Sequence, residues 1–352
     1  MVDFAGWLMP VQYASIVEEH QATRNAIGLF DVSHMGRINF TGAGACDFLN
    51  RIVTRDVKSL TRGQVRYALV TNDEGGILDD VLVYHLAEGG DGESYYQLVV
   101  NASNREKILD WLKTQKPDRN AVTLEDRTLA TAMIAIQGPK AISAIGPLSS
   151  VDPTSLKYYT AIETTIGGAP GILGRTGYTG EDGWEIVVPS EAAVTIWNSL
   201  LENGAAVGAK AAGLGSRDTL RLEAAMPLYG HELNEQINPI EAGLGFAVNL
   251  EGRTFPGIDV LKQAKANANL KRRVGLELSG KRVPREHYNV LANDKVVGEV
   301  TSGTFSPTFD RPLAMAYVQP QYSEPGTDLF IDIRGKQEPA KVVKLPFYKR
   351  AK

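Results

Sequence analysis

Residues 65–86 read VRYALVTNDEGGILDDVLVYHL, and this stretch predicts a β-hairpin. A β-branched and aromatic run comes first, the turn-forming letters NDEGG follow, and a second apolar run returns. Two adjacent carboxylates, Asp79 and Asp80, stand just past the two glycines, where the second strand should enter a core. The hairpin therefore brings acidic side chains to the edge of a buried sheet.

Successive residues of a strand point to opposite faces, so the two carboxylates are expected to lie on opposite faces of the sheet. Asp80 falls in line with Leu82 and Tyr84, and Asp79 with Val81. Both faces are apolar, so at least one carboxylate is expected against buried surface, where a lone charge is costly. The alternative is that both lie in the solvated mouth of the hairpin, the commoner place for two aspartates after a turn.

Composition places the chain among ordinary globular proteins and excludes several function classes. Its 352 residues are 43% hydrophobic and 22% charged, enough for about two to three domains. The net charge of −4 argues against a general nucleic-acid binder, which needs a strong basic excess. Residues 270–352, however, carry 15 Lys and Arg against 9 Asp and Glu. That excess, which begins at Lys271, Arg272 and Arg273, suggests an acidic partner.

The single cysteine and the histidines predict no disulfide and no metal site. Cys46 has no partner for an intrachain disulfide, which favours a reducing compartment. The five histidines have no close spacing with other ligand types. No apolar run approaches the length of a membrane span, and the N-terminus has no charged-then-apolar signal. We expect a soluble protein of the cytoplasm, or of the mitochondrial matrix if the source is eukaryotic.

Other local signals predict mixed helices and strands before a β-rich tail. Ser15 and Glu18 form a capping box that opens a helix, and Ser103 and Glu106 form a second one. Residues 172–189 predict a second hairpin. Residues 262–273 are lysine-rich and read as a helix and linker, and everything beyond reads as strands. The expected domains are residues 1–265, with two interleaved α+β subdomains, and residues 272–352.

Glycine-rich motifs give little support for a nucleotide site. The sequence GLGSRD (213–218) precedes an apolar helical pattern, as an anion-binding loop would. No phosphate-binding loop pattern, no dinucleotide fingerprint and no nucleophile elbow is present. The motifs alone predict only an α+β protein with a β-rich tail.

Six ordered blocks of sequence add a family resemblance that covers nearly the whole chain. They are MVDFAGWLMPVQY (1–13), GLFDVSHMG (28–36), NDEGGILDDVLVY (72–84), GRTGYTGEDGWEI (174–186), SRDTLRLEAAMPLYGHEL (216–233) and TSGTFSPT (301–308). Together they closely resemble the aminomethyltransferases, the T-proteins of the glycine cleavage system. Family members usually carry a short leader before the first block, so either the start of this sequence was assigned late or the leader is absent.

The resemblance implies a fold, a reaction and two partners. The fold would have three domains around a central folate channel, with antiparallel sheets and a C-terminal β-barrel of jelly-roll type. The enzyme would take the aminomethyl group from the lipoyl arm of H-protein, release ammonia and form 5,10-methylenetetrahydrofolate from tetrahydrofolate. No metal is implied, and neither nucleic acid nor membrane is an expected partner.

The resemblance also assigns roles to residues of this sequence. Asp80 matches the functional carboxylate, and a fixed anion there would stabilise developing positive charge and help manage a proton. Glu185 matches a folate-binding position, where a carboxylate suits a two-donor pterin edge, and Glu181 is the competing candidate. Arg217 matches a third ligand position, which would bind either the pterin carbonyl or the glutamate tail. The remaining pocket-lining matches are Met35, Tyr67, Tyr84, Asn101, Tyr158 and Tyr178.

Without the resemblance, most of these residues have plainer explanations. Arg217 would pair with Asp218 on a helix surface, and Glu185 would be a surface residue after a turn. Two related functions also stay open: a folate-dependent demethylase, and a non-catalytic folate-binding protein tied to iron–sulfur maintenance. The demethylases usually sit beside a flavin domain, and none is present. The non-catalytic group carries a cysteine in a block that matches residues 175–182, where this chain has none.

Overall fold

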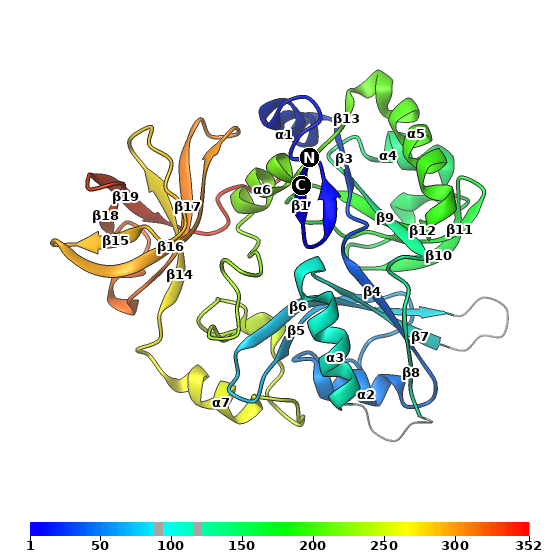
Figure 1. Cartoon of the computed structure of the whole chain (residues 1–352), viewed down its shortest axis with the longest axis horizontal. Helices are drawn as coiled ribbons and strands as arrows, with labels where there is room; N and C mark the ends of the chain where they lie inside the picture. Colours follow the sequence, from blue (N-terminus) through cyan, green and yellow to red (C-terminus); the bar gives the residue numbers. More distant parts are fainter. Residues whose placement is uncertain (88–93, 116–120, 352) are drawn as a thin grey trace. The chain divides into compact units, whose positions relative to one another are not determined.

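A computed structural model of the chain describes residues 1–87, 94–115 and 121–351. Figure 1 shows helices and strands interspersed over the first three quarters of the chain, and strands without α-helices over residues 267–351. The helices are α1 (Ile16–Asn25), α2 (Ala45–Ile52), α3 (Arg105–Gln115), α4 (Ile142–Ile145), α5 (Ala193–Gly204), α6 (Leu214–Glu223) and α7 (Ile258–Ala266). The predicted α+β class is confirmed.

The chain forms two compact units, and each is discontinuous in sequence. Unit 1 comprises Met1–Val70, Leu78–Arg217 and Glu251–Phe255. Unit 2 comprises Thr71–Ile77, Asp218–Leu250 and Pro256–Lys352. The domain boundary expected between residues 265 and 272 stays a prediction, since the compact units divide the chain in another way.

The predicted hairpin forms one edge of an antiparallel five-stranded sheet in unit 1. The strand order is β5 (Val65–Thr71), β6 (Ile77–Ala87), β7 (Ser94–Val100), β4 (Gly36–Thr41) and β8 (Thr123–Asp126). Helices α2 and α3 cover one face, where Phe48, Ile52 and Ile108 pack with Val83 and Leu98. Burying this apolar face contributes about 25 cal/mol per Å² of surface removed from water, so it fixes the register of the hairpin.

A six-stranded sheet forms the other layer of unit 1. Its order is β10 (Ala161–Ile166), β11 (Ala169–Gly174), β12 (Gly183–Pro189), β9 (Thr131–Gln137), β3 (Ile27–Asp31) and β13 (Ala209–Ala211). Helices α4 and α5 pack on it through Ile145, Ile196 and Leu200. Strands β11 and β12 are the second predicted hairpin, which is therefore confirmed. A short ribbon of β1 (Val2–Phe4) and β2 (Trp7–Met9) precedes both sheets.

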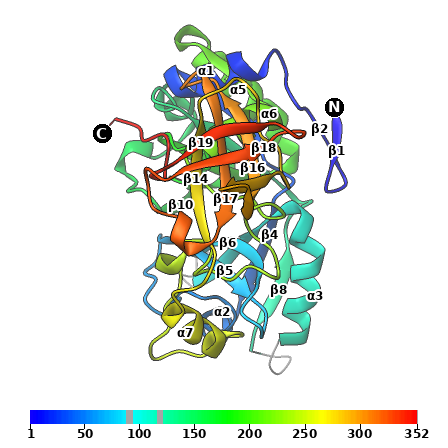
Figure 2. The same cartoon turned by 90° about the vertical axis from the view of Figure 1, so that its left-hand side faces the viewer.

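Unit 2 contains a closed six-stranded barrel. The order is β14 (Arg272–Leu278), β17 (Arg311–Val318), β16 (Lys295–Ser306), β15 (Asn289–Ala292), β18 (Asp328–Asp332) and β19 (Gln337–Val343). Figure 2 shows β18 and β19 crossing β14 at a steep angle. The expected C-terminal barrel is confirmed. Buried polar contacts join the barrel to the end of α6. Glu223 is fully buried and accepts a hydrogen bond from Thr308 Oγ1 at 2.7 Å.

Two expected element boundaries were wrong, each for a physical reason. The GLGSRD segment is largely helical, because α6 already begins at Leu214; Gly213 and Gly215 allow close approach to Val11 and Ile16, where a Cβ would lie 2.5 Å from the nearest atom. The second capping box does not form, because the helical backbone begins at Ala102 and Asn104 turns inward. By contrast, Ser15 caps α1 as predicted, accepting from Glu18 N at 3.2 Å.

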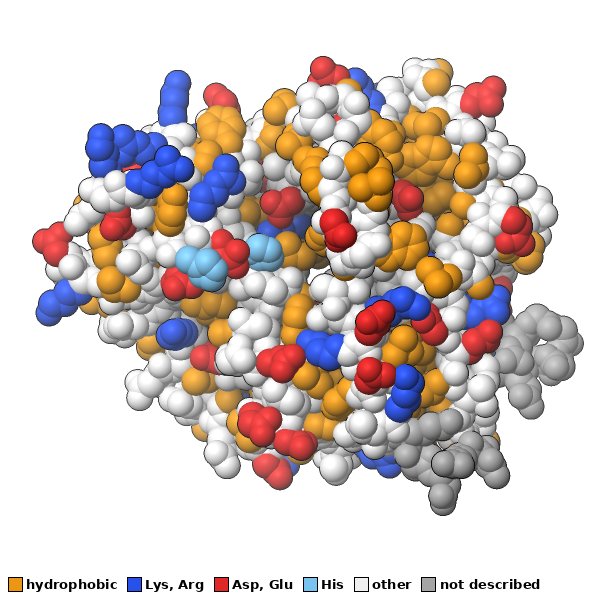
Figure 3. Space-filling model, viewed as in Figure 1, with side chains coloured by type: hydrophobic (Ala, Val, Ile, Leu, Met, Phe, Trp, Pro, Cys, Tyr) orange, Lys and Arg blue, Asp and Glu red, His pale blue; other side chains and the backbone are white. Residues whose placement is uncertain are grey.

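The basic tail is only partly available to a partner. Figure 3 shows Lys and Arg side chains gathered over the barrel strands on the displayed face. Arg273, however, is half-buried and donates hydrogen bonds to the carbonyl oxygens of Ala242 (2.9 Å) and Ala225 (3.0 Å). This arginine therefore holds unit 2 together, whereas Lys271 is exposed.

Candidate active site

The predicted alternation of the second hairpin strand is present in β6. Asp79 is fully buried, whereas Asp80 on the opposite face is only partly buried. The reading in which both carboxylates are solvated is therefore wrong. Of the two, Asp80 is the one that a ligand could reach.

Asp80 is held by neutral hydrogen-bond donors. Tyr67 Oη, from the neighbouring strand β5, donates to Asp80 Oδ2 at 3.1 Å. Asn101 Nδ2, at the end of β7, donates to Asp80 Oδ1 at 2.7 Å. In the described part of the chain no lysine or arginine forms an ion pair with this carboxylate. Burial raises the pKa of Asp80 to about 6, and the two donors partly oppose that rise. The group is thus a base close to neutral pH.

Glu185 is a second buried carboxylate in unit 1, on β12. Thr176 Oγ1 donates a hydrogen bond to its Oε2, and Tyr84 Oη lies 3.4 Å from the same threonine hydroxyl. Burial raises the pKa of Glu185, while Thr176 and the positive charge of Arg217 lower it in part. Among the residues that the structure describes, Thr176 is its only hydrogen-bond donor, so Oε1 is left for a ligand.

Arg217 lies in the first turns of α6 with its guanidinium over an aromatic ring. Its Cζ is 4.8 Å from the centroid of Tyr178, a cation–π distance. Burial lowers the pKa of Arg217, and Glu185 opposes that shift. Within residues 1–87, 94–115 and 121–351, no carboxylate lies within ion-pair distance of it, so the surface pairing with Asp218 is wrong. A half-buried guanidinium without an anion is an open binding group.

Tyrosines connect these three charged groups. Tyr67 interacts electrostatically with Tyr178 and Tyr159, and Tyr159 in turn with Glu185 and Asp80. The predicted residues Asp80, Tyr67, Asn101, Tyr84, Glu185, Tyr178 and Arg217 thus form one continuous set of interactions in unit 1. Tyr158 is 47% exposed and contacts Tyr159 edge to face at 4.8 Å. Met35 is half-buried; its backbone carbonyl accepts from Arg37 and its backbone N–H donates to the carbonyl oxygen of Val32.

Sequence reasoning missed three neighbours of this set. Tyr159, in a left-handed conformation (φ 62°), interacts electrostatically with Glu185 and Asp80. The only signal for it in the sequence was the adjacent aromatic pair Tyr158 and Tyr159. Thr176 links Glu185 to Tyr84. His34 is buried, and its Nδ1 has no hydrogen-bond partner in the described structure. Burial and the nearby charges of Arg217 and Arg37 lower the pKa of His34 to about 3, so it is neutral.

Glu181, the competing candidate to Glu185, has a structural role. Its Oε1 accepts from Arg24 Nη1 at 2.9 Å, and both side chains are 4% exposed. Arg24 also donates to the carbonyl oxygen of Thr179 at 2.8 Å. Glu181 therefore fixes the tip of the second hairpin to α1, which favours Glu185 as the ligand-binding acid.

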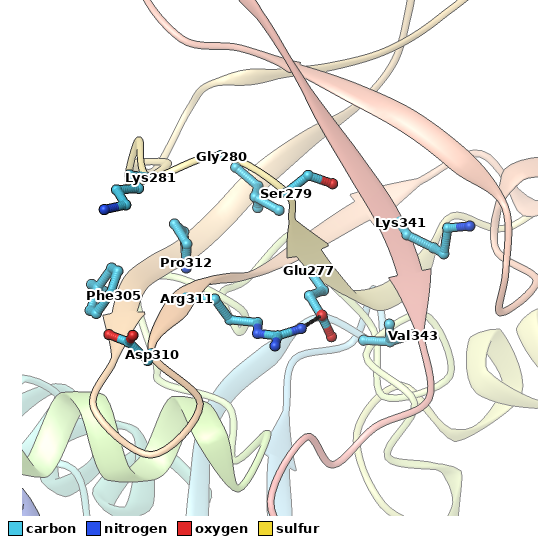
Figure 4. Close-up of a pocket in the computed structure, with 11 residues that line it drawn as sticks. Glu277, Ser279, Gly280, Lys281, Phe305, Asp310, Arg311, Pro312, Lys341 and Val343 are labelled. Carbon is cyan, nitrogen blue, oxygen red and sulfur yellow. Dashed lines mark hydrogen bonds and ion pairs between the residues drawn. The ribbon is translucent and has the colours of Figure 1, made fainter.

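A separate pocket on the barrel contains none of these residues. Its volume is about 560 Å³, and Figure 4 shows Lys281, Phe305, Pro312 and Lys341 around it. Arg311 in its wall already pairs with Glu277. The described residues contain no cluster of three or more metal-ligating side chains. None of the described helices is long and apolar enough to cross a membrane.

Two family models match the chain. Residues 1–252 match the GCVT N-terminal domain, and residues 271–349 match the glycine cleavage T-protein C-terminal barrel domain.

Curated relatives match along almost the full length. The aminomethyltransferase of Streptomyces coelicolor is 46% identical, with 100% of this chain and 94% of the relative covered. That of Bacillus subtilis is 45% identical, with 99% and 95% covered. Among solved structures, the glycine cleavage system aminomethyltransferase T from Bartonella henselae superposes with a TM-score of 0.90 at 33% identity, covering 99% of this chain and 94% of that one. The chain therefore belongs to the aminomethyltransferase family, the T-proteins of the glycine cleavage system.

Proposed function

We propose that this aminomethyltransferase acts on the aminomethyl group carried by the lipoyl arm of H-protein and passes its methylene carbon to tetrahydrofolate. Ammonia and 5,10-methylenetetrahydrofolate are the products. The observation that carries the proposal is Asp80, a partly exposed carboxylate among neutral donors whose pKa lies near neutrality. The bacterial origin of the similar proteins supports a cytoplasmic location.

The chemistry of the unpaired groups fits a reduced pterin. Glu185 has an unused carboxylate oxygen and so suits a ligand edge with adjacent N–H donors. Arg217 has donors without a carboxylate and suits a ligand carbonyl or carboxylate. The orphaned, buried Nδ1 of His34, close enough to Arg217 to feel its charge, adds a further polar contact for a ligand. Tyr67, Tyr84, Tyr158 and Tyr178 offer ring surfaces for a flat aromatic ligand, with Met35 and Asn101 as further pocket residues.

Tetrahydrofolate, when bound, supplies the two nitrogens that receive the carbon and lose one proton each. Those two protons finish on the lipoyl sulfur and on the departing amine, which balances the transfer. Asp80 can take up one of them, because its carboxylate is ionised above about pH 6 and reaches the open side of β6. The same negative charge stabilises the positive charge that develops on the carbon as the amine leaves. Tyr67 and Asn101 hold the carboxylate in place for both tasks.

The test compares wild type with Asp80→Asn, using aminomethyl-loaded H-protein and tetrahydrofolate. We expect turnover to ammonia and methylenetetrahydrofolate to fall by about 10²- to 10⁴-fold, the usual contribution of a positioned acid–base group. Folate affinity, measured by calorimetry, should be retained. Asp73→Asn, at the exposed tip of the same hairpin, is the matched control and should keep full activity. Undiminished turnover in Asp80→Asn would remove the catalytic role.

A further inference from the structure

Asp79 is a fully buried carboxylate that has no role in the reaction as proposed above. Its Oδ1 accepts hydrogen bonds from Asn104 Nδ2 (2.7 Å) and Asn101 Nδ2 (2.8 Å), and its Oδ2 accepts from Asn101 N (3.0 Å). Three N–H donors at these distances are strong support for an ionised carboxylate. Each donor is neutral, so the negative charge is stabilised without being cancelled.

One amide group joins this carboxylate to the candidate catalytic one. Asn101 Nδ2 lies 2.8 Å from Asp79 Oδ1 and 2.7 Å from Asp80 Oδ1. The two oxygens are therefore within about 5.5 Å of each other, a separation at which buried like charges interact strongly. No cation forms an ion pair with either carboxylate anywhere in the described residues.

The other titratable groups facing the pair cannot neutralise it. Tyr67 and Tyr159 face Asp80, and burial raises the pKa of both hydroxyls, so they stay neutral at working pH. Asn101 and Asn104 face Asp79 and do not titrate. Burial raises the pKa of both aspartates, so the pair binds a proton more readily than solvated carboxylates do.

The partners of the two carboxylates decide which one takes up that proton. Every recorded hydrogen bond to Asp79 comes from an N–H group, and none of these can accept a proton from it. The Tyr67 hydroxyl at Asp80 can turn and accept. The hydrogen-bond partners therefore favour the proton at Asp80 and the negative charge at Asp79.

We propose that Asp79 is a positioning residue: its negative charge, held by Asn101 and Asn104, makes Asp80 a stronger proton acceptor and fixes its orientation. The proposal rests on the proposed function, because it assigns Asp80 the proton-transfer step. Asp79 itself contacts neither substrate nor product, since its side chain is fully enclosed. Asp79 acts on Asp80 through the side-chain amide of Asn101, which both carboxylates share, and through electrostatic repulsion.

The test measures how the carboxyl of Asp80 titrates in the free protein and in the reaction. Carbon-13 labelling of aspartate carboxyls, with Asp80→Asn to assign the signal, gives the titration midpoint without any substrate. In Asp79→Asn we expect this midpoint, and the acidic limb of the kcat/KM profile, to move down by about one to two pH units. An unchanged midpoint would overturn the proposal.

Asn104→Ala separates the charge of Asp79 from its packing. This variant removes one of the three donors to Asp79 and leaves both carboxylates in place, so the Asp80 midpoint should move much less than in Asp79→Asn. A downward shift as large in Asn104→Ala as in Asp79→Asn would show a general loss of structure and would also overturn the proposal. The titration in the free protein does not depend on the reaction. Inactivity of wild type with H-protein would count against the proposed function alone.

Discussion

Replacing Glu185 by glutamine should have opposite effects on stability and on folate affinity. The carboxylate is 7% exposed, has one neutral donor in Thr176, and its positive neighbour Arg217 is not within ion-pair distance. The free protein therefore carries a buried charge that is only partly compensated. A glutamine of the same shape keeps the bond from Thr176, because its carbonyl oxygen accepts in the same way.

The sign of the stability effect follows from the pKa of Glu185. Burial raises that pKa above its unfolded value, so protonated Glu185 favours folding, and this contribution is lost as pH rises through the folded pKa. At neutral pH the substitution removes the cost of the charge. We expect the free energy of unfolding to stay level or rise by about 1 kcal/mol. The difference should shrink as the pH falls and Glu185 becomes protonated in the wild type.

Binding should change in the other direction and by more. Hydrogen bonds to a charged acceptor are worth about 1.5–3 kcal/mol, and an amide would place a donor against the donor edge of the pterin. The Kd for tetrahydrofolate should therefore rise by roughly 10- to 150-fold.

Urea unfolding measures the first effect, and calorimetry with tetrahydrofolate measures the second. The matched control is Glu181→Gln, which removes the negative charge beside the buried guanidinium of Arg24. It should cost about 3–5 kcal/mol of stability and leave the Kd nearly unchanged. If Glu185→Gln destabilised the protein as much and bound folate as well as wild type, the assignment of the two glutamates would have to be reversed.

Two further predictions concern unit 2. Arg221→Met leaves Glu232 fully buried without the guanidinium 2.8 Å away, so urea unfolding at neutral pH should show a loss of about 3–5 kcal/mol. Because Arg221 helps to lower the pKa of Glu232, the loss should shrink towards about pH 5, where the unpaired acid can protonate. Gly76→Ala would place a Cβ 1.8 Å from the carbonyl oxygen of Glu235 and should lower the Tm by several degrees. The added Cβ of Gly230→Ala meets no atom within 4 Å, so this variant should lose only the stability that its positive φ costs a non-glycine residue. Equal Tm losses in the two glycine variants would contradict the packing argument.

Local patterns in the sequence were enough to predict the elements that carry the site. Strand alternation separated Asp79 from Asp80, and the structure buries them unequally, as two faces of one sheet require. The capping residue Ser15 and the second hairpin were also predicted, because each depends on residues a few positions apart.

What the sequence could not predict depends on contacts between distant segments. Asn104 reaches Asp79 from 25 positions away, and this contact replaces the local cap expected at Ser103. Gly213 belongs to a motif that resembles an anion-binding loop, but glycine is needed there because the backbone of Val11 passes close to it. The pairing of Glu181 with Arg24, 157 positions apart, likewise has no local signature.

The hydrogen bonds to Glu223 show that the C-terminal family domain is shorter than the segment that should fold as a unit. The C-terminal family match begins at residue 271, yet the carboxylate of Glu223 receives hydrogen bonds from Ser306 and Thr308 of that module. A gene fusion or an expression boundary placed at residue 271 would leave these hydroxyls without their acceptor. Segment 218–250 should therefore be kept with the barrel whenever the protein is divided into fragments.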